Sequence, residues 1–238
     1  MKDIADLTVT EIRFFNMDVI PFSSLLTVTN LRLVSTPYAF KNVDLTEDDN
    51  KNYTALHLKT GEFKHNNKIY PIELLIIERA RIILRIKGDS DIAGLFYNEI
   101  YRSLVSIDQS GLYKKCEPIA IDRDTSCVAH LDIDYMDIFS EAFRTFLGKE
   151  TVAALQSAGG KKLAVRQLVP KTLSFNVSYE VSNSILTELN ISSYPKSLVI
   201  EPRIGVSFKE KRFFTASPAD SKTHVKLISE LEKKLKKK

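Results

Sequence analysis

The chain has 238 residues, of which 44% are hydrophobic and 27% charged, and it carries a formal net charge of +4. This composition is typical of an ordinary globular protein with one large or two small domains, and the mild basic excess permits a polyanionic partner without requiring one. Two cysteines are too few for a disulfide framework or a four-cysteine zinc site. The acidic start and the lack of an apolar run of about 18 residues predict an intracellular protein of the cytoplasm, nucleoid or nucleus, not secreted and without a membrane span.

The first part of the chain alternates apolar and polar residues. This period of two, with β-branched and aromatic residues, predicts strands of an antiparallel sheet at 7–15, 25–34, 53–60 and 72–87. Apolar residues at helical spacing then predict a helix over 92–107, with Ser90 or Asp91 capping its first turn.

The same order returns near the end of the chain. Strands are predicted at 172–181, 197–200, 203–208 and 212–217, followed by a helix over 222–238 capped near Asp220. A shift of 130 positions lays Arg79 on Lys209, Arg81 on Lys211 and Ser90 on Asp220. The overlay predicts an internal duplication.

The expected organisation is therefore a first α+β repeat at 1–107 and a second at 169–238, which ends in a basic helix. Residues 108–168 are either an insertion or the start of the second unit. They contain a predicted strand at 128–139 and a predicted helix at 140–156.

The segment 78–91 predicts a strand with two unlike faces. Ala80, Ile82, Leu84 and Ile86 form an apolar face, and the opposite face carries Ile83 together with the cations Arg79, Arg81, Arg85 and Lys87. Alternate side chains on a strand are about 7 Å apart, close to the spacing of phosphates along a nucleic-acid strand. In the second repeat, Lys209 and Lys211 are expected on one face with the ring of Phe213. Solvent faces of sheets are also often rich in Lys and Arg for solubility, which is the simpler interpretation.

Two further basic segments could act as arms that hold phosphates. Lys161, Lys162, Arg166 and Lys171 follow a pair of glycines, and the chain ends in a run of lysines. Terminal lysines also suit the negative end of a helix dipole, so a solubilising role stays open.

One acidic pattern favours a different function. On a strand, His130, Asp132 and Asp134 would point the same way and could share a divalent cation. This would suit a metal-dependent nucleotidyl or phosphoryl transferase, whereas an exposed strand face would give the same pattern. The sequence contains no Gly-rich phosphate loop, no G-x-S-x-G and no H-E-x-x-H, and predicts no cofactor.

The duplicated unit of curved strands closed by one helix resembles the TATA-binding protein family. The likeness rests on "EPRIGVSFKEKRFFTASPADSKTHVKLISEL" and on "YTALHLKT" with "IELLIIERARIILRIKGDSD". It implies a curved sheet that contacts nucleic acid, with wedging side chains at Tyr53, Phe208 and Ile77. Ala80 and Glu210 stand where that family has a turn glycine, so the resemblance implies backbone binding rather than promoter reading.

The sequence thus predicts an α+β protein of two related repeats that binds DNA or RNA without being an enzyme. The expected contacts are the cations and rings named above, with Phe208 or Phe213 against bases or sugars. The alternatives are the transferase using Asp132 and Asp134, and a structural protein whose basic face docks an acidic protein partner.

Overall fold

The computed structural model describes residues 2–16, 19–158, 170–177, 196–203 and 205–236. It is an α+β protein built on antiparallel strand pairs accompanied by several helices, which confirms the predicted fold class at this level. Among the described helices, none is both long and apolar enough to cross a membrane.

The chain divides into two compact units. The N-terminal unit comprises Asp6–Cys127 and Ser217–His224, and the C-terminal unit comprises Met1–Ala5, Val128–Ala216 and Val225–Lys238. This division differs from the three consecutive segments expected from the sequence, because each unit draws on separate stretches of the chain.

The N-terminal unit contains a sheet with the strand order β2-β3-β4-β5-β1-β6. These strands are β1 (Lys2–Phe14), β2 (Asn42–Glu47), β3 (Tyr53–His65), β4 (Lys68–Glu78), β5 (Arg81–Lys87) and β6 (Ala120–His130), the ends of β1 and β6 belonging to the other unit. The helices are α1 (Phe22–Leu25), α2 (Val28–Ser35) and α3 (Ser90–Ile107), with short 3-10 turns η1 (Thr36–Tyr38) and η2 (Tyr113–Lys115).

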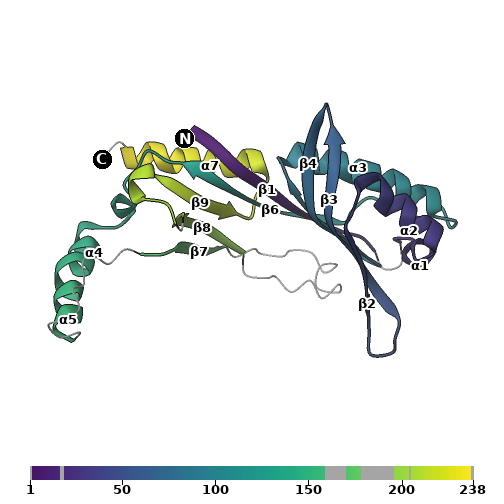
Figure 1. Ribbon diagram of the computed structural model, residues 1–238, viewed down its shortest axis with the longest axis horizontal. Helices are drawn as coiled ribbons and strands as arrows, with labels where there is room; N and C mark the ends of the chain where they lie inside the picture. Colours follow the sequence, from purple (N-terminus) through teal and green to yellow (C-terminus); the bar gives the residue numbers. More distant parts are fainter. Residues whose placement is uncertain (1, 17–18, 159–169, 178–195, 204, 237–238) are drawn as a thin grey trace. The chain divides into compact units, whose positions relative to one another are not determined.

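One face of this sheet is covered by the helices. Ile82, Leu84 and Ile86 of β5 are buried in the same core as Phe96 and Ile100 of α3, and Figure 1 shows α3 behind β3 and β4 with α1 and α2 beside it. The predicted alternation of β5 is therefore confirmed, since every second residue lies under the helices. The helix α3 is also confirmed, but its cap is Asp89, whose carboxylate accepts a hydrogen bond from the Ile92 N–H.

In the C-terminal unit, the described residues include the strands β9, β8 and β7, which neighbour one another in that order. Its elements are η3 (Tyr135–Ile138), α4 (Glu141–Thr145), the π-helical segment η4 (Phe146–Glu150), α5 (Thr151–Ala158), β7 (Leu173–Val177), β8 (Lys196–Pro202), η5 (Phe208–Glu210), β9 (Arg212–Ser217) and α7 (Ser221–Lys236), whose first turn belongs to the N-terminal unit. The closing helix is confirmed, and its cap is Asp220, which accepts hydrogen bonds from the Lys222 and Thr223 N–H groups. The helix predicted at 140–156 is confirmed as the run α4–η4–α5.

Three predicted strands are wrong, and a fourth, predicted as one strand over 72–87, is the hairpin of β4 and β5 with its turn at residues 79–80. Residues 25–34 contain α2, because the Thr27 side chain accepts a hydrogen bond from the Asn30 N–H and caps a helix where alternation predicted a strand. Residues 203–208 include a turn at Gly205, with φ +81°, followed by η5. Residues 128–139 are strand only as far as His130, where β6 ends.

Candidate nucleic-acid interface

The face of the N-terminal sheet opposite the helices carries aliphatic side chains in its middle. The strand register places Ile12, Ile83, Ile76 and His57 in one row across β1, β5, β4 and β3. The next row contains Thr10, Arg85, Leu74 and Lys59, and Thr8 pairs with Lys87 beyond it. Because paired residues share a face, we call these ten residues, together with Arg81, the open face.

The four aliphatic side chains of the open face are only partly buried. Their neighbours one position along each strand, such as Leu75, Ile82 and Leu84, are almost fully buried beneath the helices. The open face therefore combines partly buried Ile and Leu side chains with Lys59, Arg85 and Lys87 on the same surface. This is the arrangement expected of a surface that contacts a ligand with both apolar and anionic parts.

The cations of the open face have carboxylate neighbours. Arg85 Nε lies 2.7 Å from Glu73 Oε2, and Lys87 Nζ lies 3.6 Å from Glu73 Oε1 and 3.9 Å from Asp6 Oδ1. Arg81 pairs with Glu78, and Lys59 Nζ lies 3.2 Å from Asp44 Oδ2. The sequence predicted the cationic row on β5 but not these partners, which come from other strands or from the end of β4.

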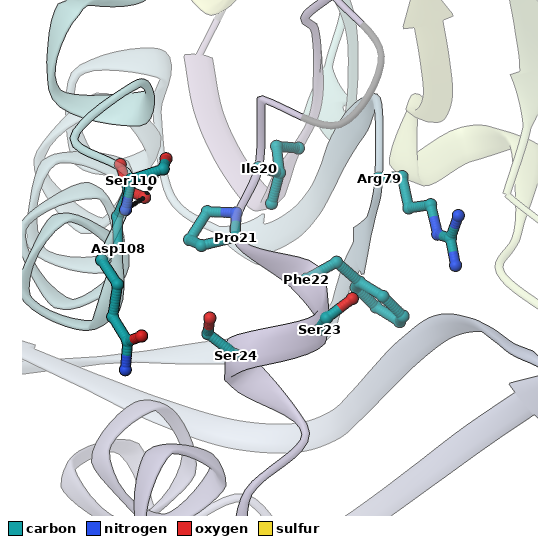
Figure 2. Close-up of a pocket in the computed structure, with 9 residues that line it drawn as sticks. Ile20, Pro21, Phe22, Ser23, Ser24, Arg79, Asp108 and Ser110 are labelled. Carbon is teal, nitrogen blue, oxygen red and sulfur yellow. Dashed lines mark hydrogen bonds between the residues drawn. The ribbon is translucent and has the colours of Figure 1, made fainter.

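Arg79 does not belong to the open face. It lies in the turn between β4 and β5 and lines a hollow of about 470 Å³ with residues of α1 and of the loop after α3. Figure 2 shows the residues that line this hollow, with Asp108 and Ser110 at the left and Arg79 at the right. Phe22, Ser23 and Ser24 lie between them. Arg79 also lines a second hollow of about 290 Å³ together with Asp48 and Asn52 of the β2–β3 turn.

Phe213, the ring predicted to contact a ligand in the C-terminal unit, is not accessible. Phe213 is only 2% exposed and lies in β9 on the same face as the buried Thr215 and Ser217, so it cannot stack on a base. Phe214 is partly exposed on the other face, paired with Glu201 of β8. A shift of one residue along a strand exchanges its faces, and the doublet Phe213-Phe214 gives no local sign of which ring is buried.

The basic residues predicted beside that ring lie outside the strand. Lys209 and the backbone of Phe208 belong to η5, and Lys211 directly precedes β9 with φ +50°. Lys211 Nζ is 2.5 Å from Asp132 Oδ1, so its charge faces a carboxylate. The predicted face of Lys209, Lys211 and Phe213 is therefore not formed.

The positions that the family resemblance implies as wedges between bases differ in their exposure to solvent. Tyr53 begins β3 and is 41% exposed, so its ring is accessible. Ile77 is fully buried beneath the helices and cannot reach a ligand. The predicted contacts Lys161, Lys162 and Arg166 lie outside the described residues, and Lys171 is exposed just before β7.

The acidic residues considered for a metal site do not converge. Asp132 is held by Lys211 and by Lys236, whose Nζ lies 3.3 Å from Asp132 Oδ2, and these ammonium groups lower the pKa of Asp132 to about 2. Asp134 instead accepts a hydrogen bond from the Met136 N–H and caps η3. Within the described part of the chain, no three His, Cys, Asp or Glu side chains are grouped so that they could hold a metal ion. The ligand geometry proposed for His130, Asp132 and Asp134 is wrong because β6 ends at His130.

One buried cluster was not foreseen from the sequence. His224 Nδ1 lies 2.8 Å from Ser217 Oγ, and His224 Nε2 lies 3.5 Å from Cys127 Sγ. All three side chains are at most 2% exposed, so a substrate cannot reach the thiol or the hydroxyl. Burial lowers the pKa of His224 to about 4, which keeps the imidazole neutral at physiological pH. The cluster is therefore part of the core rather than a catalytic centre.

Comparisons with known proteins add no family to this description. Neither a search of protein-family models nor a search of curated proteins gave a match to the chain.

Proposed function

We propose that this protein binds nucleic acid through the open face of its N-terminal sheet and is not an enzyme. The observation that carries the proposal is the shared surface of partly buried aliphatic residues and the cations Lys59, Arg85 and Lys87. The cations would contact phosphates, and the aliphatic rows would lie against sugars or bases. Tyr53, at the start of β3, would provide an aromatic contact at the end of the sheet.

The ion pairs of the open face are compatible with this function. Both side chains of the Arg85–Glu73 pair are partly accessible, about half of the Arg85 side chain and a third of the Glu73 side chain. Ion pairs at such exposed positions contribute only about 0–1 kcal/mol each. A phosphate can therefore replace a carboxylate at small cost, and the gain from released counterions favours the exchange.

The order of elements supports a diverged TATA-binding-protein-like duplication. The series β1, α1–α2, β2–β5, α3 is followed by β6, α4–α5, β7–β9, α7, so a strand, a helical segment, several strands and a long helix occur twice. In this alignment the second repeat begins near β6, which favours the start of a second unit over an insertion for residues 108–168. In the first repeat the helices cover one face of the sheet, which leaves the open face for a ligand.

The proposal is tested by fluorescence anisotropy with labelled single-stranded RNA, single-stranded DNA and duplex DNA over a series of salt concentrations. The test variant is Arg85→Gln/Lys87→Gln. Its matched control is Arg32→Gln/Arg102→Gln, which removes the same charge from exposed positions on α2 and α3.

We expect salt-dependent binding that the test variant weakens and the control retains. Each lost phosphate contact should lower the slope of log K against log salt by about 0.9 for duplex DNA or about 0.7 for a single strand. Equal losses in both variants would indicate a nonspecific charge effect and contradict the assignment to the open face. An absence of binding to all three ligands would contradict the function itself.

A further inference from the structure

Glu73 reaches the open face through an irregularity in β4. In the pairing with β5, Ile72 lies opposite Ile86 and Leu74 lies opposite Arg85, so two steps along β4 match one step along β5. Glu73 is the extra residue of this β-bulge. Regular alternation would send either Glu73 or Leu74 to the helix-covered side, whereas the bulge directs both to the open face.

The bulge brings the Glu73 carboxylate between two cations. One oxygen lies 2.7 Å from Arg85 Nε, and the other lies 3.6 Å from Lys87 Nζ. Arg85 and Lys87 are alternate residues of β5, so their side chains are spaced to hold neighbouring anionic groups. The carboxylate occupies the place between them where a phosphate would receive both positive charges.

We infer that Glu73 sets the affinity of the open face for polyanions by competing with their anionic groups for Arg85 and Lys87, an inference that rests on the proposed function. The competition weakens the attraction of any polyanion. A ligand that also covers the aliphatic rows of Ile12, Leu74, Ile76 and Ile83 gains contacts that do not depend on Glu73. It therefore stays bound under conditions in which a polyanion that offers charge alone is released.

The inference is tested with Glu73→Gln, which keeps the shape of the side chain and removes its charge. The matched control is Glu230→Gln on α7, which also removes one negative charge and one exposed ion pair, that of Glu230 with Lys233 at 2.7 Å. Binding of each variant to duplex DNA, single-stranded RNA and heparin is measured across the salt series. Heparin serves as the polyanion without bases.

We expect Glu73→Gln to bind all three probes more tightly, by about fivefold for the release of one ion pair, with a similar gain for heparin and for nucleic acid because the carboxylate competes equally with phosphate and sulfate. Glu230→Gln should bind like the wild type. In an Arg85→Gln/Lys87→Gln background, Glu73→Gln should have little effect on binding, because the carboxylate then has no cation to compete for.

A stabilising role for Glu73 alone would give a different pattern. Glu73→Gln would then lower the stability of the protein and leave binding equal to or weaker than that of the wild type, which would overturn the inference while the proposed function stands. A gain of the same size in both backgrounds would also overturn it. If neither the wild type nor Glu73→Gln binds any nucleic acid, the proposed function fails and this inference fails with it.

Discussion

Ser90 and Ser221 exchange hydrogen bonds. The backbone N–H of Ser90 donates to Ser221 Oγ at 3.0 Å, and the backbone N–H of Ser221 donates to Ser90 Oγ at 2.9 Å. Each serine is the first residue of its helix, α3 or α7, and each follows an aspartate that caps the helix. The first N–H groups of a helix have no partner within it, so each serine satisfies a donor of the other helix.

We expect Ser90→Ala and Ser221→Ala each to lower the free energy of unfolding by about 1 kcal/mol, because each leaves a backbone donor without its acceptor. The measurement is urea unfolding followed by circular dichroism. Ser106→Ala is the control, since it removes an exposed hydrogen bond to the Ser103 carbonyl within α3. If Ser90→Ala lowered the free energy of unfolding no more than Ser106→Ala does, the exchanged hydrogen bonds would contribute no stability.

The two neighbouring rings of β9 should respond oppositely to truncation. Phe213→Ala should destabilise the protein by about 3–5 kcal/mol, because it leaves a cavity in a buried site. Phe214→Ala should cost less than about 1 kcal/mol, since this ring is partly exposed. Thermal and urea unfolding of both variants provide the comparison, and similar losses would contradict the assignment of the two faces.

His224 should make the protein less stable at acidic pH. Burial lowers its pKa from 6.5 to about 4, so between these values the unfolded chain binds a proton that the folded chain does not. Stability should therefore fall as the pH drops from about 6.5 towards 4, by up to about 3 kcal/mol from this residue. His224→Gln should lack this part of the pH dependence. NMR titration of the imidazole provides a direct check, and an inflection near pH 6.5 in the folded protein would contradict it.

Asp132 should affect the stability of the protein in a lower pH range than His224 does. Hydrogen bonds from Lys211 and Lys236 lower its pKa from 3.8 to about 2, so its ion pairs stabilise the fold above about pH 4 and are lost as the pH falls towards 2. Asp132→Asn should be less stable than the wild type at neutral pH, and the difference should shrink below pH 4. Unfolding curves at several pH values measure this difference. A constant difference down to pH 2 would show that the charge of Asp132 is not responsible.

Local patterns predicted several elements correctly. The alternation of β5, the helical spacing of α3 and the capping role of Asp220 depend on residues within a few positions of one another, so the sequence alone contains the signal. The strand predicted at 25–34 was wrong. The Thr27 cap and the packing of Val34 stabilise the helix α2 there, although the alternating pattern of the residues also suits a strand.

The amino-acid sequence by itself determined that β5 has an apolar face and a cationic face, because side chains alternate along any strand. Only the tertiary structure decided which side chains those cations contact. The bulge in β4 brings Glu73 to Arg85, the pairing of β1 with β5 brings Asp6 near Lys87, and the register of β8 and β9 buries Phe213 while leaving Phe214 accessible. These outcomes depend on which strands pair and in which register, a property of distant residues that no local period encodes.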